Sequence, residues 1–515
     1  MTIGAKPHVV VVGGGIAGLA AAFFLRDEQV RVTVLDGSPR LGGKLSASDV
    51  AGVSMDEGAE ALLARRPEGI ALITAAGLGD DLVPAGVTSS AIYSRGVFRS
   101  LPRRQFMGVP ADVDELATTE VISAEGVARA RDESPRPAED GDVSVTEYIG
   151  SRLGVEVVDR LVDPLLGGVY AGRSEDLSFQ ATLAPLAAAT HEYPLLTEAA
   201  ASLAPPRPGT SPDNSKMPSA AVPLIPPRPA PTPDNSKMPS AGDSPSSGSG
   251  AKPAPIFVTL TTGLGSLPES VAKASGADVR VNAMVRELTR TETGWRLTIG
   301  SAAAPEYLDA DAVIVATPAA PAARLLKGIA NEAAAQLERI PYASMAIVTL
   351  AFRAEDFPAQ QRSGYLVPAV DGRAVKAATF STIKWPHLAR AADPKHPVHI
   401  VRCSVGRSGD VAVLQRDDGD LADLAAADLA AAVGITARSV AQRVTRWGGG
   451  LPQYNVGHLD RVARIRAAVA AQPGLAVAGA AYDGVGIPAC IATARSAADQ
   501  IIAHLVASSH AGPGG

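Results

Sequence analysis

Three glycines near the N-terminus have the spacing of a loop that binds a dinucleotide. Gly13, Gly15 and Gly18 follow a short apolar run and precede an Ala/Leu-rich segment. In this arrangement the first glycine permits a tight turn, the second lets the backbone approach a pyrophosphate, and the third lets a helix pack close to a strand. Asp36 closes the next apolar run, where a carboxylate can bind a ribose hydroxyl. The pattern therefore predicts a nucleotide site at a helix N-terminus, which favours negative charge.

A second glycine pair follows this acid. Gly42 and Gly43 lie between Arg40 and Lys44, and such a pair alone is more often an ordinary turn. In this position it resembles the second fingerprint of the glutathione-reductase-like FAD enzymes of the amine oxidase type. The combined signal indicates FAD rather than NAD.

The elements that must position these motifs form a strand–helix–strand unit. His8–Val12 and Arg31–Leu35 are short β-branched runs, and Ile16–Asp27 has the composition of a helix. Later pieces of the same sheet are expected at 279–281, 312–316 and 475–478, with a final helix over 488–505. The sequence thus predicts an α/β fold whose Rossmann-like, glutathione-reductase-like FAD-binding domain is discontinuous. Its parts are residues 1–60, 257–320 and 445–515.

The rest of the chain is expected to form an α+β substrate-binding domain from residues 61–204 and 321–444, with strands at Ala91–Phe98 and Met345–Ala351. Residues 205–255 differ in kind, because they are rich in Pro, Ser and Gly and contain two copies of the sequence PDNSKMPSA. Such a composition cannot bury enough surface to become ordered, so we predict a flexible insertion. Recognition of its Pro-rich motifs by a partner stays open.

Composition restricts the class of protein. Of the 515 residues 46% are hydrophobic and 19% are charged, with a net charge of −6, which argues against a disordered chain and against nucleic-acid binding. Two cysteines make no disulfide framework, and no cluster has metal-ligand spacing, so we expect a cytoplasmic protein without a metal.

His8–Leu25 contains no Lys, Arg or acid and could be read as a signal peptide or membrane span, but four glycines interrupt it. Peripheral membrane contact and the oligomeric state stay open.

Four longer segments resemble the protoporphyrinogen/coproporphyrinogen oxidase family: Val162–Gly172, Phe257–Gly265, Lys384–His387 and Leu451–His458. The last two are more similar to the Gram-positive coproporphyrinogen III oxidases than to the mitochondrial enzymes. The resemblance covers the chain outside 205–255. It implies an FAD-dependent enzyme of haem biosynthesis that oxidises coproporphyrinogen III to coproporphyrin III in three two-electron steps and reduces oxygen to hydrogen peroxide. A downstream ferrochelatase would be a transient partner.

Three alternatives are kept. One is a protoporphyrinogen IX oxidase, and another is a related flavoenzyme such as a carotenoid desaturase or an amine oxidase. The third is a carrier of the same fold that binds no flavin. The Gly168–Gly172 and Lys384–His387 segments speak against the second, and the intact FAD fingerprint speaks against the third.

The resemblance also implies site residues, although no catalytic acid or base is expected because the cofactor carries the chemistry. Val285 would lie at the adenine, and Trp447 with Val485–Ile487 at the flavin ring, although Trp447 could instead be a core aromatic. The predicted cofactor contacts are Gly13, Gly14, Gly15, Ile16, Ala17, Gly18, Asp36, Gly37, Arg40, Gly43, Lys44, Gly58, Ala59, Glu60, Ala61, Val285, Trp447, Val485, Gly486 and Ile487.

Four residues are expected to contact the substrate: Arg66, Arg95, Arg99 and Tyr170. Arg95 and Arg99 lie four residues apart on an expected strand, hence on one face, where their charges would suit propionates. For Tyr170, packing in the core is an equal alternative.

Overall fold

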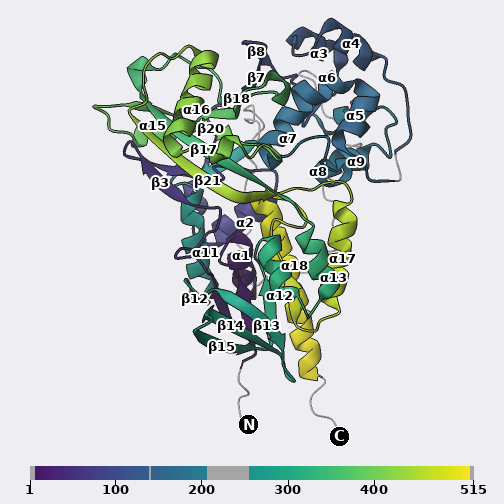
Figure 1. The fold of residues 1–515 in the computed structure, drawn as a ribbon, viewed down its shortest axis with the longest axis vertical. Helices are drawn as coiled ribbons and strands as arrows, with labels where there is room; N and C mark the ends of the chain where they lie inside the picture. The colour runs from purple at the N-terminus through teal and green to yellow at the C-terminus, as the bar shows by residue number, and fades with distance from the viewer. Residues whose placement is uncertain (1–5, 139–140, 206–254, 511–515) are drawn as a thin grey trace, which may run out of the picture. The chain divides into compact units, whose positions relative to one another are not determined.

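A five-stranded parallel sheet forms the base of the nucleotide site in this computed structural model, which describes residues 6–138, 141–205 and 255–510 (Figure 1). The strand order is β12-β2-β1-β16-β22, and every neighbouring pair is parallel. The strands are β1 (His8–Val12), β2 (Arg31–Leu35), β12 (Asp278–Arg280), β16 (Ala312–Val315) and β22 (Leu475–Val477). They come from well-separated stretches of the chain, which confirms the predicted discontinuous α/β fold.

Both faces of this sheet are buried, which explains the uninterrupted apolar sequence of β1. Val9 and Val11 pack in one core, and Val10 and Val12 pack in another. The first core contains the helices α1 (Ile16–Leu25), α2 (Pro67–Ala75), α11 (Leu267–Ser275) and α18 (Ile487–His510). The second contains α12 (Ala319–Leu326), α13 (Asn331–Glu338), α17 (His458–Ala470) and the antiparallel strands β13 (Val285–Arg290), β14 (Trp295–Ser301) and β15 (Ala304–Ala310).

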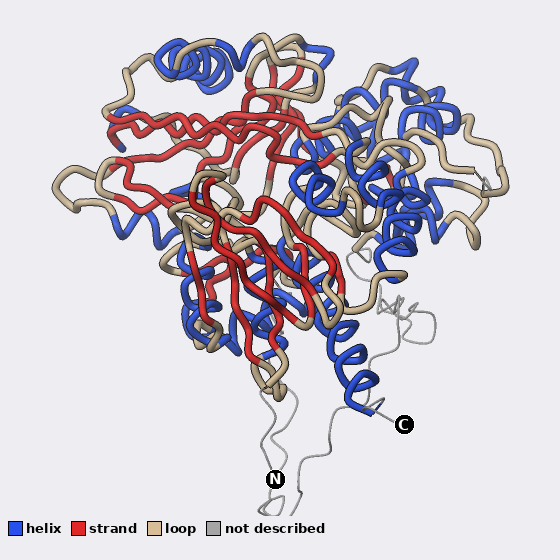
Figure 2. Tube along the Cα trace, turned by 60° about the horizontal axis from the view of Figure 1, so that its bottom comes forward, coloured by secondary structure: helices blue, strands red, loops and turns tan. Residues whose placement is uncertain are grey.

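A second, seven-stranded sheet has the order β21-β17-β20-β19-β18-β7-β8 and is antiparallel except between β18 and β7. Its long strands cross the upper left of Figure 2, and helices gather at the upper right. The strands are β7 (Ser90–Ser94), β8 (Val97–Ser100), β17 (Tyr342–Arg353), β18 (Gly364–Leu366), β19 (Val375–Phe380), β20 (Val398–Val405) and β21 (Ala441–Pro452). Helix α16 (Asp418–Val433) packs against this sheet in a shared core.

The helical part has its own core of Leu, Val and aromatic side chains. Ser123, Ser144 and Ser178 immediately precede three of its helices and accept hydrogen bonds from backbone N–H groups of the first turn, as is typical of helix N-caps. Its helices are α3 (Val113–Thr119), α4 (Ala124–Arg131), α5 (Val145–Leu153), α6 (Val155–Val157), the π-helical turn η2 (Val158–Val162), α7 (Asp163–Tyr170), α8 (Phe179–Thr182), α9 (Ala184–Ala189) and α10 (Leu196–Leu203).

Short elements connect these parts. The strands are β3 (Ala47–Val50), β4 (Val53–Asp56), β5 (Leu62–Leu63), β6 (Leu82–Pro84), β9 (Gln105–Phe106), β10 (Val109–Pro110) and β11 (Phe257–Leu260), and the helices are α14 (Ser381–Lys384) and α15 (Pro386–Ala391). No helix in the described part of the chain is long and apolar enough to cross a bilayer. The uncharged stretch His8–Leu25 is instead a strand followed by a helix.

Two expectations need correction. The strand predicted at Ala91–Phe98 is a hairpin, because Arg95 and Gly96 both have positive φ and form the turn between β7 and β8. The domain boundary predicted at residue 445 falls inside β21, which pairs along its length with β17 in the seven-stranded sheet. The other boundaries stay predictions, and the predicted insertion at 205–255 lies outside the described residues apart from its two end positions.

Candidate functional site

A cavity of about 1210 Å³ opens where the parallel strands end. Val12, Leu35 and Ala316 line it, at the carboxyl ends of β1, β2 and β16. In the sheet, β1 has β2 as its neighbour on one side and β16 on the other, so the order of the strands reverses direction at β1. Open α/β sheets bind ligands at such a switch point.

The first glycine loop forms one wall of the cavity. Gly13 has φ of 115°, which L side chains rarely adopt. A Cβ on Gly18 would collide with the carbonyl oxygen of Gly13, whereas a Cβ on Gly15 would meet no atom within 4 Å. Gly15 therefore leaves open space at the start of α1, and Gly18 permits the close packing of that helix.

Asp36 anchors this loop from the end of β2. Its Oδ2 accepts a hydrogen bond of 2.6 Å from the backbone N–H of Gly14, and its Oδ1 accepts two bonds of 2.7 Å from the N–H and the hydroxyl of Ser38. Asp36 also lines the cavity. The same carboxylate thus shapes the loop and faces the space where a ribose is predicted.

The second glycine segment touches the first. The N–H of Gly42 donates to the carbonyl of Gly14 at 2.8 Å, so the two glycine loops meet at the cavity wall. Arg40 donates to the carbonyls of Leu41, Gly43 and Leu45 and therefore shapes the segment. Lys44 lines the cavity, and burial lowers the pKa of its ammonium group.

The predicted cofactor contacts line this cavity with three exceptions. Gly14, Gly18 and Arg40 do not line it, but they shape the two glycine loops as described above. Trp447 is at the wall and donates from its indole Nε1 to the carbonyl of Glu57 at 3.1 Å. The structure thus brings together residues that are as much as 474 positions apart, between Gly13 and Ile487.

The seven-stranded sheet forms the opposite wall. Ile347, Ser404 and Ala377 are neighbours across β17, β20 and β19 and line the cavity together. Arg402 and Thr379 form the next cross-strand pair, and both line the cavity. Gly168 and Val169 of α7 complete this wall.

A buried ion cluster joins the two walls. Glu60 Oε1 lies 2.8 Å from Lys384 Nζ, and Glu60 Oε2 lies 2.6 Å from Arg402 Nη1. Burial alone would raise the pKa of Glu60, but the charges of Lys384 and Arg402 lower it to about 2. Arg402 also donates to the carbonyl of Gly58 at 2.6 Å. Glu60 is therefore an ionised structural partner rather than a proton acceptor.

The four predicted substrate contacts do not line the cavity. Arg66 pairs with Glu68 at 2.9 Å, and Arg99 pairs with Glu120. Tyr170 is buried, with its ring 5.5 Å from that of Tyr454. A role for these residues in binding substrate stays a prediction, and the geometry favours other side chains.

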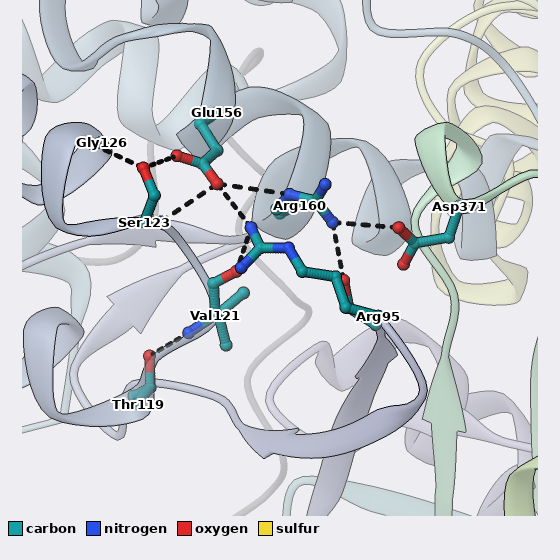
Figure 3. A network of polar contacts seen from close by, with 9 residues as sticks. Arg95, Thr119, Val121, Ser123, Gly126, Glu156, Arg160 and Asp371 are labelled. Atoms are coloured by element: carbon teal, nitrogen blue, oxygen red, sulfur yellow. Dashed lines mark hydrogen bonds and ion pairs between the residues drawn. The ribbon is translucent and has the colours of Figure 1, made fainter.

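Arg95 lies in a turn and is already paired with an acid, so the structure gives its predicted substrate contact no support. Because it lies in the β7–β8 turn, it does not share a strand face with Arg99. Figure 3 shows its guanidinium pointing to Glu156, at 2.6 Å, and to the carbonyl of Val121. Glu156 also contacts Arg160 and Ser123, so Arg95 fastens the hairpin to the helical part.

Sequence reasoning missed several residues of the cavity wall. Arg402 could have been found, since an arginine in an apolar strand requires a buried partner. Ser404 and Thr379 give no such signal, because small polar residues are common in strands. Further wall residues that were not predicted as contacts include Met284, Arg286, Pro321, Arg324, Leu325, Tyr342, Met345, Ile347, Ala377, Gly450, Leu451 and Cys490. Within the described ranges, no group of three or more His, Cys, Asp or Glu residues could hold a metal.

Comparison with known proteins agrees with this geometry. The family described as flavin containing amine oxidoreductase matches residues 16–502. The coproporphyrinogen III oxidase of Mycobacterium leprae is 35% identical over 96% of this chain and 98% of its own length, and that of Propionibacterium freudenreichii is 36% identical over 98% and 93%. A solved structure from Exiguobacterium sp. 255-15, whose name refers to protoporphyrinogen oxidation, is 28% identical with a TM-score of 0.78 and covers 96% of this chain and 98% of that chain.

The residues present fit FAD, because the open space at Gly15 and the start of α1 can accept a diphosphate and the cavity continues to Trp447. The cofactor is FAD, and the protein is an oxidoreductase. The chain belongs to the flavin-containing amine oxidoreductases, and several of its full-length bacterial relatives are coproporphyrinogen III oxidases.

Proposed function

We propose that this protein oxidises a porphyrinogen, specifically coproporphyrinogen III to coproporphyrin III, with molecular oxygen as the electron acceptor. The named relatives support this substrate. Proteins named coproporphyrinogen III oxidase are 34–36% identical to the chain in Mycobacterium and Propionibacterium species and 27–29% identical in Staphylococcus aureus and Bacillus subtilis. The chloroplastic protoporphyrinogen oxidase of Nicotiana tabacum is 24% identical.

The observation that carries the proposal is the two-walled cavity. At about 1210 Å³ it exceeds the roughly 300–1,000 Å³ of a pocket for one small ligand. One wall carries the glycine loops of the nucleotide site, and the other carries a sheet face with Met345, Ile347 and Ala377. The arrangement offers room for a flat apolar macrocycle beside the flavin ring.

The charges of the cavity suit an anionic substrate. Four cationic side chains line it, which are Lys44, Arg286, Arg324 and Arg402, against the two acids Asp36 and Glu60. Arg402 is already committed to Glu60 and the carbonyl of Gly58, so the other three cations are the candidates for propionates and for the FAD diphosphate.

The overall reaction balances as one porphyrinogen and three O₂ giving one porphyrin and three H₂O₂, with six electrons and six protons transferred. When bound, FAD supplies the two-electron chemistry of each step. The chain binds the macrocycle against the sheet, holds its propionates and excludes water with the apolar wall. Its buried carboxylate at the cavity, Glu60, is held ionised by its two cations and does not need to move a proton.

The test compares two substrates under anaerobic conditions. The reduction of protein-bound FAD is followed by absorbance after mixing with coproporphyrinogen III or protoporphyrinogen IX, and kcat/KM and peroxide yield are measured in air. We expect a higher kcat/KM for coproporphyrinogen III and three peroxides for each porphyrin. Equal or better turnover of protoporphyrinogen IX would refute the proposed substrate, but it would still agree with the broader proposal that the protein oxidises a porphyrinogen.

A further inference from the structure

The segment Leu451–His458 runs from the end of β21 to the first residue of α17 and buries three polar side chains almost completely. Gln453 is 2% exposed, Tyr454 is 1% exposed and His458 is fully buried. Polar groups buried this deeply normally have hydrogen-bond partners. The partners here are backbone groups of two cavity walls.

Tyr454 and His458 hold the loop that follows β22. The Tyr454 hydroxyl donates to the carbonyl of Ala480 at 2.6 Å and accepts from the N–H of Gly484 at 2.7 Å. His458 Nε2 donates to the carbonyl of Tyr482 at 2.9 Å. Since a carbonyl can only accept, Nε2 carries the proton. Burial lowers the pKa of His458 to about 4, which keeps the ring neutral.

The loop that they hold is part of the flavin side of the cavity. Gly479, Ala480, Ala481, Val485 and Gly486 line the cavity, and none of them lies in a strand or helix. With no ladder of backbone bonds, the position of the loop depends on side-chain hydrogen bonds such as those of Tyr454 and His458. The Tyr454 hydroxyl bridges two residues of the loop four positions apart, Ala480 and Gly484, and the hydroxyl of Thr493 accepts from the N–H of Gly479.

The same segment also contacts the substrate side. Gln453 Nε2 donates to the carbonyl of Tyr170 at 2.8 Å, and the ring of Tyr454 lies 5.5 Å from the ring of Tyr170. Tyr170 ends α7, the helix that contributes Gly168 and Val169 to the cavity. On its other face Tyr454 stacks on His458, with ring centroids 3.9 Å apart and planes at 12°.

We propose that Tyr454 is a positioning residue that fixes the loop Gly479–Gly486 at the flavin ring and aligns it with α7. His458 supports it by stacking and by its own bond to the loop. The expected effect of Tyr454 on FAD binding requires only that FAD occupies the cavity. Its expected effect on the alignment of substrate with the flavin rests on the proposed function.

The test uses Tyr454→Phe in the full-length holoenzyme, since this change keeps the ring contacts and removes two hydrogen bonds. The matched control is Tyr365→Phe, because Tyr365 is also buried and its hydroxyl has no partner among the described residues. We expect FAD to bind Tyr454→Phe with a roughly tenfold higher Kd, because a loop that has lost its two restraints must be ordered when FAD binds, and we expect the visible flavin spectrum to shift. Tyr365→Phe should leave both unchanged.

Steady-state kinetics with coproporphyrinogen III give a second readout. We expect kcat of Tyr454→Phe to fall roughly tenfold while KM stays within about twofold, because misalignment acts on the reaction more than on binding. His458→Phe keeps the ring stack with Tyr454 and loses the hydrogen bond to Tyr482. It should raise the Kd of FAD by less than Tyr454→Phe does. If Tyr454→Phe does not fold, His458→Phe is used in its place. An unchanged FAD Kd and spectrum in both variants, or equal losses in Tyr365→Phe, would overturn the inference. If the unmodified protein does not oxidise coproporphyrinogen III, the proposed function is wrong. The Kd of FAD and the flavin spectrum then still show whether Tyr454 positions the loop.

Discussion

Replacing Lys376 by methionine should stabilise the protein. Lys376 lies on β19 at a shift of register against β20, and its side chain is 2% exposed. Its Nζ has no hydrogen-bond partner among the described residues. Burial, and secondarily the charge of Arg407, lower its pKa from 10.5 to about 7. Methionine has similar length and no charge to desolvate, so Lys376→Met removes the cost and keeps the packing.

The magnitude and the pH window follow from linkage. The unfolded chain binds this proton up to about pH 10.5 and the folded protein only up to about pH 7. At about 1.4 kcal/mol for each pH unit, the cost of the buried lysine is on the order of 5 kcal/mol below pH 7. The cost falls as pH rises from 7 and disappears near pH 10.5. The advantage of Lys376→Met should therefore be largest at pH 6 and shrink steadily between pH 7 and pH 10.

The assay is urea unfolding of the two holoproteins at matched FAD concentration, at pH 6, 8 and 10, followed by flavin fluorescence and far-UV circular dichroism. Lys395→Met is the control, because Lys395 is exposed and should change stability by less than about 0.5 kcal/mol. A variant that is no more stable than the unmodified protein at pH 6 would refute the reasoning. An advantage that does not depend on pH would show that the gain comes from packing rather than from the charge.

Three further changes test the site. Gly15→Val should give a folded protein without bound FAD, because the new side chain enters only open space in the cavity. Visible absorbance measures the flavin content, and the circular dichroism spectrum should stay unchanged. Full flavin content would contradict the assignment of the nucleotide site. Glu60→Gln should lower the free energy of unfolding at pH 7 by about 3–5 kcal/mol, because Arg402 and Lys384 lose their buried partner. The lowered pKa of Glu60 means that this stabilisation is complete above about pH 4.5 and is lost as pH falls towards 2, so urea unfolding of the unmodified protein should approach that of the variant at low pH. Arg99→Ala should cost less than about 1 kcal/mol and leave the ratio of kcat/KM for the two porphyrinogens unchanged, since its pair with Glu120 is at the surface; a changed ratio would return Arg99 to the substrate site.

The parts that sequence reasoning predicted well are those with local causes. The β1–α1–β2 unit is recognisable because both faces of β1 are buried and because Gly13 and Gly18 meet at a contact that no side chain could occupy. The β7–β8 hairpin was missed because apolar and aromatic residues flank Arg95 and Gly96 on both sides, and this dipeptide gives only a weak turn signal.

The ion cluster could not be predicted for a different reason. Arg402 on β20 signals a buried partner, but Glu60 lies 342 residues earlier in the chain. Nothing in either local sequence indicates the other, and several acids could have served. Non-local pairs of this kind come from the way the sheets are assembled, which composition and periodicity do not describe.

The strand order of the parallel sheet has a consequence for biosynthesis. The N-terminal strand β1 has β16 as one neighbour, with paired residues 303 positions apart, and β22 pairs with the other edge of β16. Helix α18 packs against α1, whose N-terminus is predicted to receive the diphosphate. Nearly the whole chain must therefore be synthesised before the FAD site can form. Until then the apolar residues of β1 and α1 stay exposed to solvent. Cellular yield should thus depend on chaperone capacity and on FAD supply late in translation more than on the stability of the N-terminal unit.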